Sequence, residues 1–235
     1  MTRQVLVTGG TSGIGWAIAD AFAREGCRVL ATGLTNAEAA RTPRIAALEA
    51  RQLDVTQPAE IAAVIAELKS LDVLVNAAGT IVRNGGEHDP EVFARVIDVN
   101  LNGAMRVCAA ARPLLVKTRG CVINIASMLS FFGSGYAPAY SASKGGVAQL
   151  TKSLAIAWAA EGIRVNAIAP GWIETALTAP LVADLARRDA IVARTPLGRW
   201  GQPADVAGAA LFLASPAAAF ITGVILPVDG GYSVA

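Results

Sequence analysis

Tyr140 and Lys144 are the two residues whose types and spacing point most clearly to chemistry. They frame the segment Tyr-Ser-Ala-Ser-Lys, and side chains four positions apart lie on one face of a helix. A neighbouring ammonium group can lower the pKa of a phenol, ordinarily about 10, toward working pH. A phenol tuned in this way can donate and accept the proton of a carbonyl/alcohol pair. We therefore predict proton transfer at Tyr140, with Ser127 nearby at the end of an apolar run.

A glycine-rich segment near the start of the chain predicts a binding site for a dinucleotide. Residues 8–15 read Thr-Gly-Gly-Thr-Ser-Gly-Ile-Gly, between a strand-like run and a helix-like one. Glycines permit a tight turn and let backbone N–H groups approach a pyrophosphate at the helix N-terminus. The spacing differs from G-x-G-x-x-G, but its place in the chain favours a dinucleotide site over a plain turn. The candidate contacts are Gly9, Thr11, Ser12, Gly13, Ile14 and Gly15.

The end of the second predicted strand bears on which dinucleotide binds. An acidic residue there favours NAD, but the segment is Thr32-Gly33-Leu34, with neither a carboxylate nor an arginine. Binding the 2′-phosphate of NADP without a partner cation costs more free energy than binding the ribose hydroxyl of NAD without a partner carboxylate. We therefore favour NAD, with NADP as the alternative. Gly33 and Leu34 are the candidate contacts at this end.

Two further segments follow predicted strands. Asp54 could accept a hydrogen bond from the adenine amino group, or it could cap a turn or helix. The small residues of Asn76-Ala77-Ala78-Gly79 admit a flat ligand, or they form an ordinary strand-to-loop turn.

Short apolar runs alternate with segments of helical period along the chain. The predicted strands are Gln4–Thr8, Arg28–Thr32, Arg51–Leu53, Asp72–Asn76, Cys121–Ala126, Arg164–Ala169 and Val224–Val228. The predicted helices are Ile14–Arg24, Ala59–Lys69, Glu91–Val99, Gly103–Lys117, Tyr140–Ala160 and Ala204–Ala214, and Asp89-Pro90 predicts an N-cap followed by proline. This alternation predicts an α/β fold: one Rossmann-type doubly wound parallel sheet of about seven strands with helices on both faces. We expect residues 1–235 to form a single domain, with residues of about 172–200 as a lid at the sheet's carboxyl edge.

Composition limits the class of protein. Hydrophobic residues make up 54% and charged residues 16%, so helices and subunit contacts must cover much of the surface. The net charge of +2 without a dense Lys/Arg run argues against nucleic acid or an anionic membrane as partner. No apolar stretch approaches the roughly 20 residues of a membrane span, and the first strand leaves no room for a signal peptide. Cys27, Cys108 and Cys121 lack metal-ligand spacing and indicate reduced thiols in a cytoplasm, with no metal site.

Taken together, these motifs resemble those of the short-chain dehydrogenase/reductase family over essentially the whole chain. They are Thr8–Gly15, Asp54-Val55, Asn76–Gly79, Asn100, Ser127, Tyr140-x-x-x-Lys144 and Pro170-Gly171-Trp172-Ile173-Glu174-Thr175. The resemblance implies an NAD(P)-dependent enzyme that transfers a hydride between nicotinamide and a secondary alcohol or ketone. It also implies a homotetramer built through residues 103–117, 140–160 and 227–231.

The resemblance implies a role for each of four residues. Tyr140 is expected to be the catalytic acid/base, and Lys144 to lower its pKa and bind the nicotinamide ribose. Ser127 is expected to orient the substrate oxygen, and Asn100 to hold a water that joins Lys144 to solvent. Taken singly, Ser127 could instead form a strand-end turn, Asn100 a helix kink and Lys144 a solvated charge.

The resemblance also implies most of the remaining cofactor contacts. They are Asp54, Val55, Asn76, Ala77, Ala78, Gly79, Tyr140, Lys144, Pro170, Gly171, Ile173 and Thr175. Ile173 and Thr175 are expected to contact the carboxamide.

The substrate side is expected to combine apolar contacts with one cation. The substrate-binding candidates are Arg83, Ser127, Met128, Leu129, Tyr140 and Trp172. Arg83 could pair with a substrate carboxylate, or it could be a solvated loop cation. Residues 127–131, 140–144 and 198–203 resemble the branch that holds 2-deoxygluconate 3-dehydrogenases and other sugar-acid or polyol oxidoreductases. A cyclic or aryl alcohol fits the aromatic residues as well.

Two other functions stay open at this stage. A 3-oxoacyl thioester reductase would need a basic patch for an acidic carrier, and Arg187, Arg188 and Arg194 are candidates for it. A non-catalytic dinucleotide-binding protein would not be expected to keep all four chemical groups. His88 lies in a glycine-rich stretch, and we expect it to be a surface residue without a catalytic role.

Overall fold

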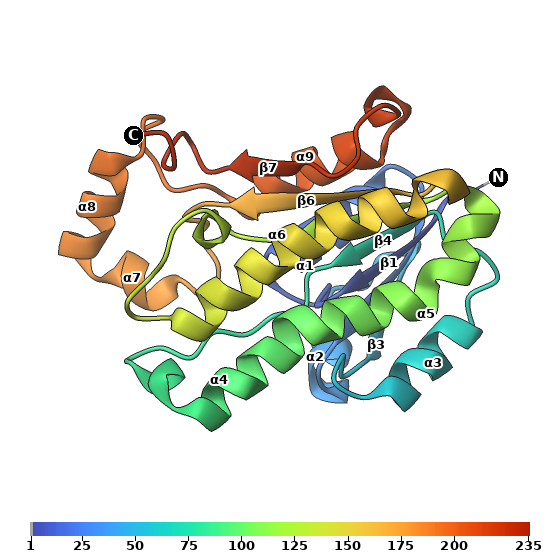
Figure 1. Ribbon diagram of the computed structural model, residues 1–235, viewed down its shortest axis with the longest axis horizontal. Coiled ribbons are helices and arrows are strands. Elements are labelled where there is room, and N and C mark those ends of the chain that lie inside the picture. The colour runs from blue at the N-terminus through green and yellow to red at the C-terminus, as the bar shows by residue number, and fades with distance from the viewer. Residues whose placement is uncertain (1) are drawn as a thin grey trace.

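Seven parallel strands form a single sheet in the computed structural model, which describes residues 2–235 (Figure 1). The strands are β1 (Gln4–Thr8), β2 (Arg28–Gly33), β3 (Leu48–Gln52), β4 (Val73–Asn76), β5 (Cys121–Ile125), β6 (Arg164–Pro170) and β7 (Ile225–Val228). Their order is β3-β2-β1-β4-β5-β6-β7, so the direction of winding reverses between β1 and β4. The predicted doubly wound α/β sheet is confirmed.

The helices connect these strands and begin with recognisable signals. They are α1 (Gly13–Arg24), α2 (Asn36–Arg41), α3 (Pro58–Ala66), α4 (Pro90–Ile97), α5 (Gly103–Thr118), α6 (Pro138–Trp158), α7 (Ala179–Ala183), α8 (Leu185–Arg194) and α9 (Pro203–Ala214). Proline occupies the first position of α3, α4, α6 and α9, where its missing N–H costs no helical hydrogen bond. Asp89 caps α4 as predicted, accepting from the backbone N–H of Glu91 and Val92 at 2.8 and 3.0 Å.

The sequence did not predict α2, α7 and α8. None of these three helices contains a buried residue, and α2 and α7 have only six and five residues, so no core-facing stripe of the kind that marks the longer helices reveals them. The third strand is the edge strand Leu48–Gln52, whereas we predicted Arg51–Leu53. Its side chains are only partly buried, so the burial pattern that marks the inner strands is weak there.

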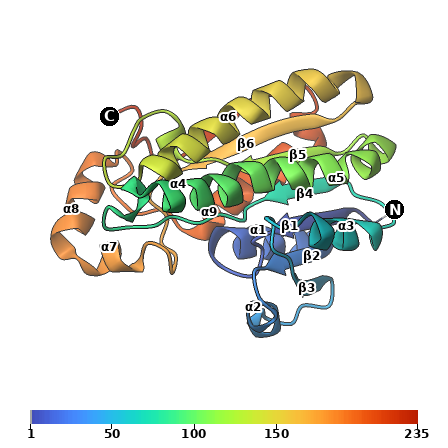
Figure 2. The same ribbon diagram turned by 60° about the horizontal axis from the view of Figure 1, so that its bottom comes forward.

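Two hydrophobic cores sandwich the sheet. Val5 and Val7 of β1 point to the core formed with α1 and α9, while Leu6 points to the core formed with α3, α5 and α6. This alternation follows from the two-residue period of a strand. Figures 1 and 2 show α4, α5 and α6 covering one face of the sheet.

The strand register places three loops side by side at the carboxyl edge of the sheet. Thr8 of β1 pairs with Asn76 of β4, and Asn76 pairs with Asn124 of β5. The loops that follow β1, β4 and β5 therefore emerge together, at the point where the strand order reverses. Such a crevice is where ligands bind in open α/β sheets. Helices α7 and α8 lie beyond this edge, within the predicted lid (Figure 1).

Candidate functional site

The glycine turn between β1 and α1 has the backbone shape that a phosphate site needs. Gly9 and Gly13 have φ of +65° and +54°, a region that favours glycine. A Cβ at Gly9 would lie 2.7 Å from the Ala78 Cα, and a Cβ at Gly15 would collide with the Gly9 carbonyl. The N-cap Ser12 makes no side-chain capping bond, and no acidic residue occupies the first turn of α1. The first backbone N–H groups of α1 can therefore receive an anion.

The end of β2 differs from the sequence-based expectation, because a carboxylate reaches it from α2. Glu38 Oε2 accepts from the Leu34 N–H at 2.7 Å and would lie 2.9 Å from a Cβ placed on Gly33. Thr11 of the glycine turn also faces Gly33, with its Oγ1 2.5 Å from that Cβ position. Thr35 caps α2 by accepting from the Glu38 N–H at 3.2 Å. The Thr-x-x-Glu spacing, typical of a capping box, was the signal that could have revealed Glu38.

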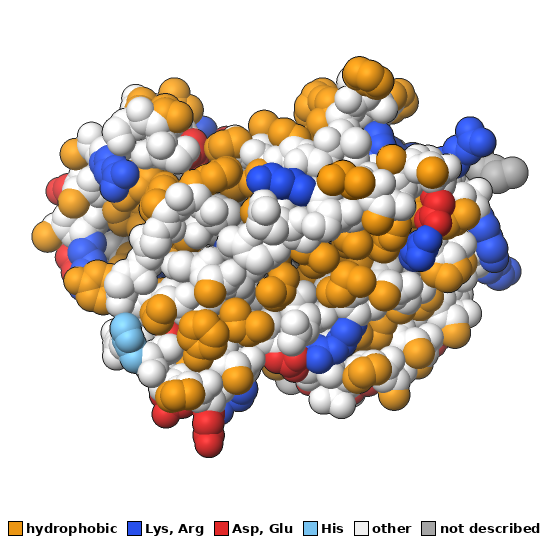
Figure 3. Space-filling view, in the orientation of Figure 1, with side chains coloured by type: hydrophobic (Ala, Val, Ile, Leu, Met, Phe, Trp, Pro, Cys, Tyr) orange, Lys and Arg blue, Asp and Glu red, His pale blue; other side chains and the backbone are white. Residues whose placement is uncertain are grey.

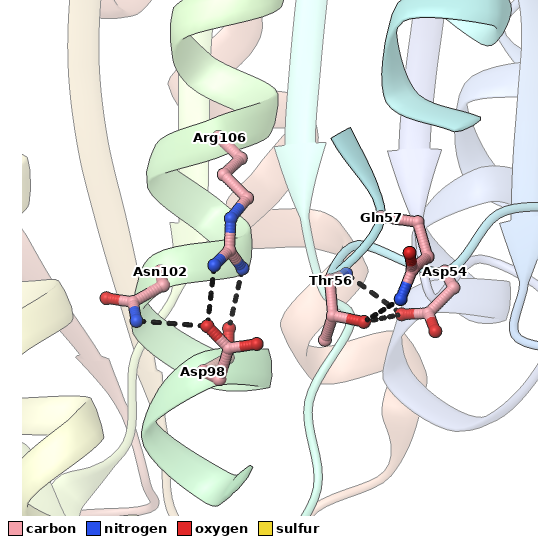
Figure 4. Close-up of polar contacts among 6 residues, drawn as sticks. All are labelled: Asp54, Thr56, Gln57, Asp98, Asn102 and Arg106. Carbon is pink, nitrogen blue, oxygen red and sulfur yellow. Dashed lines mark hydrogen bonds and ion pairs between the residues drawn. The ribbon is translucent and has the colours of Figure 1, made fainter. Parts of the chain in front are cut away.

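Asp54 forms a turn after β3 (Figure 4). Its Oδ1 accepts from the backbone N–H and the hydroxyl of Thr56, both at 2.8 Å. Its own N–H donates to Glu60 Oε2 at 2.8 Å. The turn interpretation of Asp54 therefore holds, and its Oδ2 has no hydrogen bond within residues 2–235.

The Asn76 side chain points into the core and not toward the predicted cofactor. Its Nδ2 lies 2.9 Å from Asn124 Oδ1 and 3.2 Å from Cys108 Sγ. Asn124 in turn donates to Thr151 of α6 at 2.9 Å, so these amides link β4, β5 and α6. Contact with a ligand at this point thus falls to the backbone and to Ala77, Ala78 and Gly79.

Lys144 is a buried cation next to Tyr140. Its Nζ donates to the Ile125 carbonyl at 2.6 Å and lies 5.5 Å from the centre of the Tyr140 ring. Burial lowers the pKa of Lys144 to about 8. The alternative of a solvated surface lysine is therefore wrong, since the side chain is 5% exposed.

The pKa of Tyr140 is raised in this structure, whereas we predicted that Lys144 would lower it. Burial of the phenol is the largest cause, and a hydrogen bond with Ser127 acts in the opposite direction. Two side chains from the loop after β4 also act: Glu87 raises the pKa and Arg83 lowers it. Desolvation favours the neutral phenol, and it outweighs the opposing influences of the protein groups around it.

Ser127 lies directly after β5, with an extended backbone that starts a short turn. Its hydroxyl accepts from the Leu129 N–H at 3.1 Å. Ser130 Oγ accepts from the Ser127 N–H at 3.4 Å and donates to the Lys144 carbonyl at 2.7 Å. The turn therefore attaches Ser127 to α6, the helix that carries Tyr140 and Lys144.

Asn100 joins α6 to the loop after β4. Its amide oxygen accepts from the Thr80 N–H at 2.7 Å, and its amide nitrogen donates to the Thr80 carbonyl at 2.9 Å. The same nitrogen lies 3.0 Å from Ser143 Oγ. A Cβ at Gly79 would lie 3.3 Å from Asn100 Oδ1 and 3.6 Å from Lys144 Nζ, so these two side chains flank Gly79.

A single π-helical turn, Asp98–Asn102, places Asn100 at this point. Arg106 and Asn102 both donate to Asp98 Oδ1, at 2.6 and 3.1 Å (Figure 4). The bond from Arg106 holds the pKa of Asp98 below its usual range. Asn100 thus lies in an irregular turn between α4 and α5, and π-turns occur frequently at functional sites.

The substrate side brings Arg83 next to the lid. Arg83 Nη2 donates to the Leu177 carbonyl at 2.9 Å, and its charge acts on the Tyr140 phenol. Met128 is buried and Leu129 is half-buried. Trp172 packs on Trp200 with ring centres 5.6 Å apart, and it lines a cavity of about 540 Å³. That cavity lies between residues of the segment 172–201 and residues 227–231, and Ser127, Tyr140 and Lys144 do not line it.

The three arginines that a thioester reductase would use, Arg187, Arg188 and Arg194, are all exposed on α8. The Arg194 guanidinium lies 4.3 Å from the centre of the Tyr232 ring and donates to its hydroxyl at 3.3 Å. Arg187 pairs with Asp184 at 3.5 Å. His88 is exposed, and its Nε2 lies 3.1 Å from the Gly135 carbonyl.

Comparison with known proteins assigns the chain to a family. Residues 9–233 match a family model described as enoyl-(acyl carrier protein) reductase. The chain is 45% identical over 240 residues to a 2-dehydro-3-deoxy-D-gluconate 5-dehydrogenase of Bacillus subtilis strain 168, covering 98% of this chain and 94% of that protein. The chain belongs to the short-chain dehydrogenase/reductase family. This confirms the family and branch predicted from the motifs.

Two other family members resemble this short-chain dehydrogenase closely. A cis-4-hydroxycyclohexanecarboxylate dehydrogenase of Sinomonas cyclohexanicum is 42% identical, covering 98% of this chain and 96% of that protein. A crystal structure of a gluconate 5-dehydrogenase from Burkholderia cenocepacia J2315, in complex with NADP and tartrate, has a TM-score of 0.93 at 36% identity. That match covers 99% of this chain and 96% of the other.

The family assignment fixes the reaction class of this short-chain dehydrogenase. It is an oxidoreductase that acts on secondary alcohols or ketones with a nicotinamide dinucleotide. No group of three or more His, Cys, Asp or Glu within residues 2–235 is arranged to hold a metal ion. None of the helices described in that range has the length and hydropathy needed to cross a membrane.

Proposed function

We propose that the protein interconverts a secondary alcohol and a ketone in a small molecule that also carries a carboxylate. The observation that supports this best is the position of Arg83, which donates to the Leu177 carbonyl and follows Val82, the residue that Glu87 connects to the Tyr140 backbone. No salt bridge joins Arg83 to a carboxylate within the described chain, residues 2–235. A guanidinium in that position suits a substrate carboxylate. Gluconate and cis-4-hydroxycyclohexanecarboxylate, named for relatives above, each combine a secondary alcohol with a carboxylate. The candidate substrate classes are sugar acids and cyclic hydroxy acids, and uncharged polyols and aryl alcohols are weaker candidates.

Tyr140 carries the proton in this proposal. During ketone reduction its hydroxyl donates to the oxygen on which negative charge develops, and Ser127 donates a second hydrogen bond to that oxygen. Lys144, with a pKa of about 8, is mostly protonated at neutral pH and stabilises the phenolate that remains. Asn100, across Gly79 from Lys144, holds a water that returns the proton. When bound, the nicotinamide dinucleotide supplies or accepts the hydride.

The cofactor residues are those predicted from the sequence, with Asn76 acting through its backbone. The glycine turn and the N-terminus of α1 would hold the pyrophosphate, because their N–H groups are uncapped. Lys144 and Tyr140 would contact the nicotinamide ribose, and Ile173 and Thr175 the carboxamide. Thr175 is close to the glycine turn, because its Cγ2 lies 3.6 Å from a Cβ placed on Gly13. This position supports a contact between Thr175 and the same cofactor.

NAD is the proposed cofactor, in preference to NADP. The Glu38 carboxylate over Gly33 can accept a hydrogen bond from a ribose hydroxyl, whereas it repels a 2′-phosphate. The Burkholderia cenocepacia structure contains NADP, so Glu38 is the feature of this chain that argues for NAD.

The protein is further proposed to be a homotetramer in the cytoplasm. Hydrophobic side chains gather on the face that carries α4, α5 and α6 (Figure 3). Phe93, Met105, Val116 and Ile156 are exposed there, Ile156 by 81%, and a second copy would cover them. The three buried free thiols fit a reducing compartment. Sedimentation velocity tests the assembly, and a stable monomer at working concentration would contradict it.

The test of the proposed function uses matched substrate pairs. We expect cis-4-hydroxycyclohexanecarboxylate and gluconate to be oxidised with a higher kcat/KM than cyclohexanol and the corresponding polyol. Arg83→Ala should reduce kcat/KM about 10- to 100-fold for the acids, because a charge-assisted bond contributes about 1.5–3 kcal/mol. The uncharged alcohols should change little. Steady-state formation of the reduced nicotinamide, followed by absorbance, measures both.

The control for this test is Arg95→Ala, which removes an exposed cation from α4. It should leave both substrate classes unchanged. If Arg83→Ala affected acids and uncharged alcohols equally, carboxylate recognition by Arg83 would be wrong.

A further inference from the structure

Glu87 is a fully buried carboxylate that the proposed chemistry does not yet use. It lies in the 3₁₀ turn Gly86–His88 and is 0% exposed. Its Oε1 accepts from the Val82 N–H at 2.8 Å, and its Oε2 accepts from the Tyr140 N–H at 2.8 Å. Because both oxygens accept from N–H groups, the geometry suits the ionised form. A buried charge is costly, so a carboxylate retained here calls for a physical reason.

The N-terminus of α6 provides the first reason for a buried carboxylate at Glu87. The N-cap residue is Ala137, which has no side-chain acceptor, and α6 is a 21-residue helix. Glu87 supplies the missing acceptor from 53 positions away, at the third residue of the helix. A negative charge at a helix N-terminus is stabilised by the macrodipole and by the free N–H groups. That third residue is Tyr140 itself.

The second reason is the set of charges around the phenol. Glu87 and Arg83 approach Tyr140 from the loop after β4, with opposite effects on its proton. Lys144 approaches from the next turn of α6, 5.5 Å from the ring centre. Ser127 approaches from the end of β5 with a neutral hydroxyl. No salt bridge neutralises Glu87 within residues 2–235, so its charge is not cancelled by a cation in direct contact.

We propose that Glu87 is a positioning residue for the reaction, fixing the backbone of Tyr140 against the loop that carries Arg83 and placing a carboxylate at the N-terminus of the helix that carries the phenol. The inference rests on the proposed role of Tyr140 as acid/base. The two hydrogen bonds connect residue 82, next to Arg83, directly to the backbone of Tyr140. The carboxylate thereby sets the distance between Arg83, which is proposed to bind the substrate, and the acid/base Tyr140. It also influences the pH at which Tyr140 loses its proton.

The test is the pH dependence of kcat/KM for alcohol oxidation, in which the phenolate is the active form. Glu87→Gln removes the charge and retains one acceptor oxygen. The rising limb of the profile should move to lower pH by about one unit, because a nearby negative charge no longer opposes loss of the proton. Glu87→Asp keeps the charge but is too short to reach both N–H groups. It should leave the limb in place and reduce kcat about tenfold through misplacement of Tyr140.

Glu91→Gln is the matched control, because it removes an exposed carboxylate four residues further along. It should not move the limb. A Glu87→Gln profile that coincides with the wild type would overturn the proposal, as would an equal displacement in Glu91→Gln. If Glu87→Gln does not fold, Glu87→Asp decides, and a wild-type kcat in that variant overturns the proposal.

Tyr140→Phe separates failure of this inference from failure of the proposed function. If that variant stays active, the limb does not belong to Tyr140 and both proposals fail. If Tyr140→Phe is inactive while Glu87→Gln keeps the wild-type limb, only the role of Glu87 is wrong.

Discussion

The chemistry proposed for this short-chain dehydrogenase rests on two neighbouring groups whose pKa values burial shifts in opposite directions. Burial raises the pKa of Tyr140 and lowers that of Lys144, because each loses solvation of its charged form. The pKa values of the phenol and the amine therefore lie further apart than in water. At neutral pH the phenol is thus kept neutral and able to donate a proton, while most of the lysine stays protonated beside it.

The buried Lys144 predicts a pH dependence of stability. Its pKa is about 8 in the folded chain and near 10.5 when unfolded, so between these values the unfolded state binds more protons. Stability due to this residue therefore rises as the pH increases from 8 to about 10.5. Urea denaturation should show wild type gaining about 2–3 kcal/mol relative to Lys144→Met between pH 7 and 10.5.

The control for this measurement is Lys117→Met, which alters an exposed lysine of α5. The difference between wild type and this variant should be nearly independent of pH. If the Lys144→Met comparison were equally flat, Lys144 would not lose its proton early in the folded state.

Single residues differ in how far the sequence reveals them. Tyr140, Lys144 and Ser127 could be found because they occur together with the glycine turn and the other motifs, in an order that is informative in combination. Glu87 could not be placed, since it acts on the N–H of Tyr140, which only the fold brings to it. Glu38 was missed although its local Thr-x-x-Glu spacing was visible in the sequence. The raised pKa of Tyr140 was also missed, because desolvation depends on the whole surrounding core.

At the scale of elements, the β2–α2 junction sets the proposed cofactor preference. Thr35 starts α2 so that the Glu38 carboxylate turns back over Gly33. Glu38→Gln keeps an acceptor for the Leu34 N–H and removes the charge. The ratio of kcat/KM for NAD to that for NADP should fall about tenfold, equivalent to about 1.4 kcal/mol of repulsion removed from the 2′-phosphate.

Glu25→Gln is the matched control for cofactor preference, because Glu25 is exposed at the end of α1. It should leave the ratio unchanged. A ratio that is the same in Glu38→Gln and wild type would show that Glu38 does not face the 2′ position.

The helices and strands that could be predicted are those whose apolar residues face the core with a clear period. β1 matched its predicted bounds, and α1, α5 and α9 each differed by one residue, since proline, capping and glycine signals mark their ends. The exposed α2, α7 and α8 carry no such pattern, and their positions depend on packing at the sheet edge. The segment 172–200, the predicted lid, is thus the part that sequence describes least well.

For the whole molecule, strand–helix alternation was enough to predict the architecture. Parallel sheets need right-handed crossovers, so the chain has few ways to place seven strands with helices on both faces. That architecture brings the loops after β1, β4 and β5 to one edge, where the glycine turn, Arg83 and Ser127 lie. The substrate is the property that the architecture does not determine, because it depends on side chains contributed by separate loops.

The central claim is that the Tyr140 hydroxyl transfers the proton, and Tyr140→Phe tests it most directly. The exposed Tyr136, replaced by Phe, is the matched control. Turnover and the Kd for NADH, from steady-state absorbance and from titration of fluorescence, should be measured on the same preparations. We predict that Tyr140→Phe loses about 10²–10⁴-fold in turnover while its Kd for NADH stays within about twofold of the wild type. Turnover close to that of Tyr136→Phe, with the cofactor still bound, would contradict the account.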